Sequence, residues 1–411
     1  MEEVLATSGP GKKNLAKPSK ITAISDVESG SFGRTSVGIK EFDQVLGGGI
    51  VPGSLILLGG DPGIGKSTII LQVAANIKNT LYISGEESER QIQMRSERLG
   101  IKSGINLVAE TNIETVIATI LAEKPQLAVI DSIQTMYSSD IPGSAGSVSQ
   151  LSLCASKLMN AAKENNIAII LIGHVTKEGN IAGPRVLEHL VDVVLYLEGD
   201  RFGSFRILRG VKNRFGSTNE TGIFDMKEGG LEAVKNPSEL MIAERAHKSS
   251  GSVIFPAMEG TRPLLVEIQA LSSPTSFGYP KRTASGFDLN RLNLLAAVIQ
   301  KRAGINLSAQ DIYLNVAGGI AVREPAADLA TVCAVASSYK NKEIPEDTVV
   351  FGEVGLAGEV RSVNNIDKRL AEAEKLGFKK AIVPKSRFTA RKGINIMMVT
   401  SVKEALDNIW R

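Results

Sequence analysis

The feature that most constrains this chain is a glycine-rich segment, Gly60–Ser67, set between an apolar strand and a helix. Its letters, GDPGIGKS, fit the phosphate-binding pattern G-x-x-x-x-G-K-[ST]. The strand is expected at Ser54–Leu58 and the helix at Thr68–Lys78. In such a loop the backbone N–H groups and the helix N-terminus surround the phosphates of a nucleotide. A glycine-rich turn without a ligand is the alternative, but the match of pattern and setting favours a nucleotide site.

Two side chains of this segment have predicted roles. Lys66 is expected to reach the β- and γ-phosphates, and Ser67 to hold Mg²⁺. The predicted cofactors are therefore ATP and Mg²⁺. The other nucleotide contacts are expected from the remaining residues of the loop, namely Gly60, Asp61, Pro62, Gly63, Ile64, Gly65 and Thr68.

Three further apolar segments read as strands, at Thr80–Ser84, Leu127–Ile130 and Ala168–Ile172. Strands this apolar are buried on both faces, which is typical of a parallel sheet covered by helices. The carboxyl ends of parallel strands meet at one edge, where ligands bind. Asp131 follows one of these strands and is the predicted second Mg²⁺ ligand. An ordinary strand-end aspartate that caps the next turn is the alternative.

Polar residues at the ends of two other strands complete the predicted site. Glu86 and Glu87 follow Thr80–Ser84, and we expect Glu86 rather than Glu87 to orient the attacking water. A solvated acidic loop is the alternative. His174 follows Ala168–Ile172 and is expected to contact the γ-phosphate and report its loss, although a lone histidine is often only structural.

The 411 residues suffice for two hydrophobic cores. Residues 1–30 are polar and lack periodicity, so they are predicted to be a flexible tail. Residues 31–245 are predicted to form an α/β domain whose mostly parallel sheet has an antiparallel extension at one edge. The Pro-, Ser- and Gly-containing stretch at Pro237–Ser252 marks a boundary, and residues 246–411 are predicted to form an α+β domain.

The composition indicates the cellular compartment in which the protein is expected. No run approaches the roughly 18–20 apolar residues of a membrane span, and the N-terminus lacks the apolar core of a signal peptide. Cys154 and Cys333 lie in apolar helical patterns and are predicted to be buried thiols in a reducing compartment. We therefore expect a cytoplasmic protein without a membrane partner. The formal net charge of +3 does not by itself indicate nucleic-acid binding.

Four segments resemble the RadA (Sms) family of bacterial RecA-related recombination and repair proteins. They read GGDPGIGKST, YISGEES, GHVTKEGNIAGPRVLEHLVD and KNRFG, the last being a signature of that family at Lys212–Gly216. The resemblance runs from about Ser19 to the C-terminus. It implies a RecA-like, DnaB-like homo-hexameric ring that moves on single-stranded DNA, drives branch migration of recombination intermediates and works with the recombinase RecA.

The resemblance also assigns roles and shows one departure. Lys212 and Arg214 would reach the ATP of a neighbouring subunit and stabilise transition-state charge in trans. Without the resemblance, this segment is only a basic turn after a strand. Family members usually begin with a zinc module of two C-x-x-C pairs, whereas the first cysteine here is Cys154, so no zinc is expected.

The last part of the chain resembles the peptidase domain of the Lon protease, in the stretches Glu324–Asp328 and Gly352–Val360. Lon uses a serine and a lysine. At the corresponding positions this chain has Ala326 and Arg369. Alanine has no nucleophile, and an arginine does not act as the base that activates one. The resemblance therefore implies a Lon-like fold without peptidase activity.

RecA-like rings hold single strands by loops that line their channel. Two glycine-containing loops follow the predicted site strands, at Asp140–Gln150 and Lys177–Arg185. Lys177 and Arg185 are the predicted phosphate contacts, with mobile surface loops as the alternative. In the second domain, Lys281 and Arg282 are predicted DNA contacts, and solvated loop charges are an equal alternative.

Together these features predict an ATP-hydrolysing DNA motor for homologous recombination and DNA repair. A rival interpretation is an ATP-switched regulatory scaffold that acts on protein partners and shares the same core. Stimulation of ATP hydrolysis by DNA separates the two.

Overall fold

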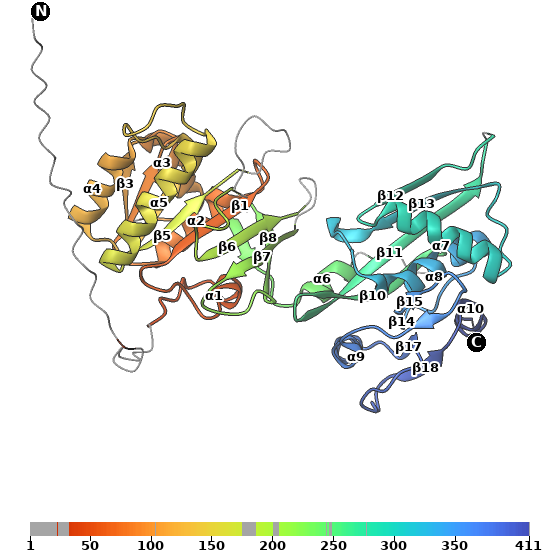
Figure 1. The fold of residues 1–411 in the computed structure, drawn as a ribbon. Coiled ribbons are helices and arrows are strands. Elements are labelled where there is room, and N and C mark those ends of the chain that lie inside the picture. The colour runs from red at the N-terminus through yellow and green to blue at the C-terminus, as the bar shows by residue number, and fades with distance from the viewer. Residues whose placement is uncertain are drawn as a thin grey trace, which may run out of the picture. The chain divides into compact units, whose positions relative to one another are not determined.

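The computed structural model describes Ala23 and residues 33–102, 104–174, 186–199, 205–243, 245, 249–276 and 278–410. The first half of the chain is built on a nine-stranded sheet of order β3-β2-β4-β5-β1-β6-β7-β8-β9 (Figure 1). The strands from β3 to β6 in this order pair in parallel. Their bounds are β1 Leu55–Gly60, β2 Thr80–Ser84, β3 Ile105–Ala109, β4 Leu127–Asp131, β5 Ala168–Ile172 and β6 Val193–Glu198.

Successive side chains of each strand point to opposite sides, so the apolar strands give the sheet two apolar faces. Helices cover both of these faces. Ile56 and Leu58 of β1 join the core that contains helix α2, whereas Leu55 and Leu57 join the core that contains α4 and α5. The helices of this half are α1 Lys40–Leu46, α2 Lys66–Asn76, α3 Glu89–Arg98, α4 Ile113–Glu123 and α5 Val148–Asn165. The predicted parallel α/β core is confirmed, and the helix predicted at Thr68–Lys78 begins two residues earlier, at Lys66.

The predicted antiparallel extension is also present. β7 pairs with β6, β8 with β7 and β9 with β8, all antiparallel. The bounds are β7 Phe205–Asn213, β8 Thr221–Lys227 and β9 Gly230–Ala233. This extension places the end of β7 beside the start of β6, which fixes where the KNRFG segment lies.

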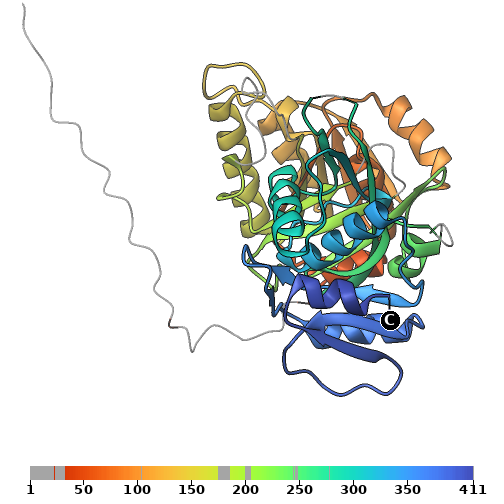
Figure 2. The ribbon, with the colours of Figure 1, turned by 90° about the vertical axis from the view of Figure 1, so that its right-hand side faces the viewer.

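The second half contains a seven-stranded mixed sheet of order β12-β13-β11-β10-β14-β17-β18. Helices α7 and α8 pack against each other, and α8 contacts β10 and β11; both helices lie in front of the strands in Figure 2. The strands are β10 Ser252–Glu259, β11 Arg262–Pro274, β12 Arg282–Ser285, β13 Gln310–Val316, β14 Thr348–Val350, β17 Lys380–Pro384 and β18 Asn395–Val399, with a separate hairpin of β15 Glu353–Val354 and β16 Val360–Arg361. The helices are α6 Pro237–Ala243, α7 Leu289–Arg302, α8 Asp328–Lys340, α9 Ile366–Lys375 and α10 Val402–Asn408.

The two cysteines are buried free thiols, as predicted. Burial raises the pKa of Cys154 to about 11 and that of Cys333 to about 12, so both stay protonated at neutral pH. Over the described ranges, none of the helices has the length and apolar content needed to cross a membrane.

The position that the Lon resemblance assigns to the catalytic lysine holds a buried ion pair. Arg369 of α9 is 1% exposed, and its Nη2 lies 2.5 Å from Glu324 Oε2. The guanidinium also donates to the carbonyl oxygens of Pro256 and Asn364. Ala326, at the serine position, is buried and carries no nucleophile. Here the arginine braces the fold, because its donors are engaged by fixed acceptors.

We expect Arg369→Ala to destabilise this half of the chain by about 3–5 kcal/mol, because Glu324 loses the partner of a largely buried pair. Trp410 is the only tryptophan and follows α10, so its fluorescence during urea unfolding reports on this half. The control is Arg361→Ala, which removes exposed ion pairs with Glu359 and Glu353 and should change stability little. Equal, small effects of the two substitutions would contradict the bracing role.

Candidate nucleotide-binding site

The phosphate-binding loop runs from the end of β1 to the start of α2. Gly60, Gly63 and Gly65 have φ values of 152°, 77° and 113°, which L side chains rarely adopt. A Cβ at Gly65 would lie 2.6 Å from the Met226 methyl group, and one at Gly60 would lie 2.5 Å from the Leu197 carbonyl oxygen. All three positions therefore favour glycine for backbone conformation, and Gly60 and Gly65 also require it for close packing. Ser67 and Thr68 follow Lys66 in the first turn of α2.

The Lys66 side chain is buried within this loop. Its Nζ donates to the carbonyl oxygens of Gly60 and Asp61, both at 2.9 Å. Burial lowers the pKa of Lys66 to about 8, although the nearby carboxylates of Asp131, Asp61 and Glu86 oppose the shift. One ammonium thus lies among three carboxylates, and a divalent cation would balance the remaining negative charge.

Asp131 ends β4 and is only 5% exposed. Its Oδ2 accepts a hydrogen bond of 2.5 Å from the hydroxyl of Tyr82 on the neighbouring strand β2. Burial, and next the charge of Asp131, raise the pKa of Tyr82 well above its usual range, so the phenol remains a donor. This bond holds one oxygen of the Asp131 carboxylate in place. Carboxylate oxygens are hard ligands of the kind that Mg²⁺ prefers.

The fit to Mg²⁺ depends on how few protein ligands this ion needs. Among the described residues, no cluster of three or more His, Cys, Asp and Glu side chains could hold a metal alone. Mg²⁺ is usually bound through one or two carboxylates together with phosphates and water. Asp131 and the Ser67 hydroxyl would suit such a site in the presence of a nucleotide.

Glu86 and Glu87 point to different partners. Glu86 Oε1 accepts from the Ser132 hydroxyl at 2.6 Å and lies 3.4 Å from His174 Nε2. Glu87 pairs with Arg95 of α3 instead. The contact with His174, and next that with Ser132, hold the pKa of Glu86 near 2, although partial burial opposes them. A carboxylate with so low a pKa is ionised at neutral pH. It suits the orientation of a water molecule better than the full removal of a proton from that water.

Three side chains of this site were not anticipated from the sequence: Tyr82, Ser132 and Gln134. Gln134 Nε2 donates to the His174 carbonyl oxygen at 3.2 Å, while its buried Oε1 has no hydrogen-bond partner among the described residues. Tyr82 lies within the apolar segment Thr80–Ser84, and only the pairing of Ser84 with Asp131 across the sheet places it beside the acid. Ser132 and Gln134 lie one and three residues after Asp131, and that proximity in the sequence is the available signal.

The structure does not bring Lys212 and Arg214 to the phosphate loop of the same chain. Val194 pairs with Lys212, and Ile56 of β1 pairs with Val193, so both basic residues lie at the amino-terminal edge of the parallel strands. The loop begins at Gly60, about 13 Å further along β1. Lys212 Nζ donates to the Glu188 carbonyl oxygen at 2.7 Å, and Arg214 Nη1 donates to Asp192 Oδ1 at 3.2 Å.

The predicted DNA contacts fall into two groups. Lys177 and Arg185 lie outside the described residues. Lys281 is exposed just before β12, the edge strand of the second sheet, and Arg282 is half-buried with its Nη1 donating to Asn293 Oδ1 at 3.2 Å. Tyr279, beside them, is 90% exposed. The nucleotide site and this basic edge therefore belong to different sheets.

Two family models match parts of the chain. Residues 25–180 match the AAA domain, and residues 291–387 match the subunit ChlI of Mg-chelatase. The first match contains the phosphate loop, Glu86, Asp131 and His174. With these matches, the predicted fold class is confirmed as a P-loop α/β core followed by a Lon-like α+β region.

Full-length relatives match nearly the whole chain. The chain is 53% identical to the DNA repair protein RadA of Bacillus subtilis over 402 residues, which cover 96% of this chain and 87% of that protein. It is 53% identical to RadA of Listeria monocytogenes, covering 97% of this chain and 90% of that protein. For RadA of Streptococcus pneumoniae the identity is 52%, covering 96% and 95%. This chain therefore belongs to the RadA family.

Proposed function

We propose that this chain is an ATP-driven motor that moves on single-stranded DNA as a DnaB-like helicase and promotes branch migration during recombination and DNA repair in the cytoplasm. The proposal includes a homo-hexameric ring and the recombinase RecA as a partner. Its main support is the meeting of Lys66, Asp131, Glu86 and His174 at one sheet edge, from which both predicted DNA loops follow. The relatives named DNA repair proteins add to this support.

The residues at this edge would each have a different role in ATP hydrolysis. The loop N–H groups and Lys66 would hold the β- and γ-phosphates. Ser67 and Asp131 would hold Mg²⁺, which neutralises charge that develops on the phosphate oxygens. Glu86 would accept a hydrogen bond from the attacking water, since its carboxylate stays ionised at neutral pH. Preorganised groups of this kind lower the barrier without reorganising during the reaction.

Lys212 and Arg214 would act on the ATP of a neighbouring subunit. Their place at the edge opposite the phosphate loop of their own chain argues against a role in cis. A head-to-tail ring joins two different surfaces of adjacent subunits, because its interfaces are heterologous, and in such a ring the edge that bears these residues would face the phosphate loop of the next subunit. Arg214 would then stabilise transition-state charge as an arginine finger does.

His174 would connect the nucleotide to the DNA grip. Its imidazole contacts Glu86, and its carbonyl oxygen accepts from Gln134, which follows Asp131 by three residues. The loop predicted to bind DNA begins three residues after His174, at Lys177. A change at the γ-phosphate would therefore reach this loop through a short chain of contacts.

The decisive experiment measures steady-state ATP hydrolysis with and without single-stranded DNA. We expect DNA to stimulate hydrolysis, and Lys66→Ala to lower the stimulated rate by at least about 100-fold, since a positioned phosphate ligand is lost. The matched control is Lys78→Ala, an exposed lysine beyond the same helix. Hydrolysis indifferent to DNA would favour the ATP-switched scaffold acting on proteins.

A mixing experiment tests the role in trans. Lys66→Ala and Arg214→Ala chains should each be inactive, but a 1:1 mixture should regain activity at roughly a quarter of the sites, because some interfaces combine an intact loop with an intact Arg214. Subunits must exchange, which a dilution and reassembly step ensures. A mixture as inactive as its components would show that Arg214 serves its own chain or only its structure.

The coupling is tested by His174→Ala. We expect basal hydrolysis to fall by less than about tenfold while stimulation by DNA is lost, because the signal from the γ-phosphate no longer reaches the loop. His189→Ala is a control, as a second histidine of the same domain. Stimulation that survives His174→Ala would contradict the coupling.

A further inference from the structure

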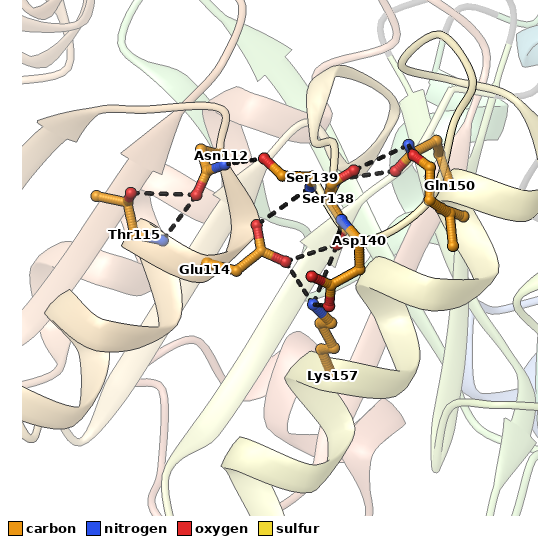
Figure 3. Close-up of polar contacts among 9 residues, drawn as sticks. Asn112, Glu114, Thr115, Ser138, Ser139, Asp140, Gln150 and Lys157 are labelled. Atoms are coloured by element: carbon orange, nitrogen blue, oxygen red, sulfur yellow. Dashed lines mark hydrogen bonds and ion pairs between the residues drawn. The ribbon is translucent and has the colours of Figure 1, made fainter. Parts of the chain in front are cut away.

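A polar network encloses the base of the loop between β4 and α5 (Figure 3). Its centre is Gln150, in the first turn of α5 and only 1% exposed. Gln150 Oε1 accepts from the Ser138 backbone N–H at 2.8 Å. Its Nε2 donates to the carbonyl oxygens of Ser138 and Ile141, at 3.1 and 3.0 Å. One buried amide thus satisfies backbone groups that a loop usually leaves to water.

Lys157, two turns further along α5, contacts residues at the base of the same loop. Its Nζ contacts the Glu114 carboxylate of α4, lies 2.5 Å from Asp140 Oδ2 and donates to Ser138 Oγ at 3.0 Å. Ser138 Oγ in turn donates to Glu114 Oε1 at 2.6 Å. Burial disfavours the charged form of Glu114, but the bonds from Lys157 and Ser138 hold its pKa near 2. The Lys157 ammonium therefore lies between two carboxylates, those of Glu114 and Asp140.

The network holds an exposed tip that carries no charged side chain. Residues 142–145, Pro-Gly-Ser-Ala, are all exposed, and Gly143 has a φ of 131°. Such a tip can meet a phosphate only through backbone N–H groups and the Ser144 hydroxyl. Contacts of that kind are weak unless the loop is already ordered, because fixing each residue on binding costs conformational entropy.

We propose that Gln150 and Lys157 are positioning residues that preorganise the tip 142–145 to take the sugar–phosphate backbone of single-stranded DNA through main-chain N–H groups. The proposal rests on the proposed DNA function. It differs from a direct contact between Lys157 and a phosphate, because Lys157 is held by Glu114 and Asp140 and lies at the base of the loop.

The salt dependence of DNA binding separates these two roles. In the full-length chain, Gln150→Ala and Lys157→Gln should each weaken binding of a fluorescent oligothymidine about tenfold, equivalent to about 1.4 kcal/mol. The slope of log K against log salt should stay unchanged, because no phosphate contact is lost. A direct phosphate contact of Lys157 would instead reduce that slope by about 0.7.

Three controls accompany this measurement. Lys157→Arg keeps the charge and the donors and should retain most of the affinity. Lys124→Gln removes an exposed lysine at the other end of α4 and should leave affinity unchanged. Hydrogen exchange of residues 138–150 should quicken in Gln150→Ala and Lys157→Gln, while basal ATP hydrolysis without DNA stays within about twofold, since neither residue touches the nucleotide edge.

Two results would overturn the proposal. One is a reduced salt slope in Lys157→Gln; the other is unchanged affinity in Gln150→Ala despite faster exchange of the loop. Failure of the proposed function has a different signature, because the unmodified chain would then not bind the oligothymidine at all.

Discussion

The parallel pairing of β1, β2, β4 and β5 is the constraint on which the rest of the molecule depends. It aligns Ser84 with Asp131 and Asp131 with Ile172, so the residues that follow these strands must meet at one edge. Parallel strands buried on both faces tolerate few changes of register, because a shift by one residue would turn every side chain to the opposite core. The positions of Glu86, Asp131 and His174 are therefore set by packing deep in the sheet.

The sequence predicted the features that depend on neighbouring residues. The phosphate loop and Asp131 could be found because glycines, a lysine and an acid occur in fixed order beside apolar strands. Tyr82 could not be assigned, since its partner Asp131 is brought to it only by the pairing of two strands. The location of Lys212 and Arg214 likewise depends on the antiparallel return of β7 along β6. The local sequence pattern indicates which residues can take part in the site, whereas the strand register sets the distances between them.

The second half shows how a catalytic position can become a structural one. A lysine that acts as a base needs a lowered pKa and a free lone pair, whereas an arginine stays protonated and offers several donors in a fixed plane. In this chain Arg369 uses those donors to join Glu324 to two backbone carbonyls. The Lon-like fold is thereby kept while the chemistry of a peptidase is not supported at these positions.

The central claim is that the nucleotide edge and the DNA grip are coupled, and the affinity for single-stranded DNA in different nucleotide states tests it most directly. Binding of a fluorescent oligothymidine would be measured with Mg²⁺ and a non-hydrolysable ATP analogue, and again with ADP. Coupling between the two sites predicts DNA affinities that differ by at least about fivefold between the two states. By linkage, DNA should change the preference for the ATP analogue over ADP by the same factor. Equal affinities in both states would contradict the account.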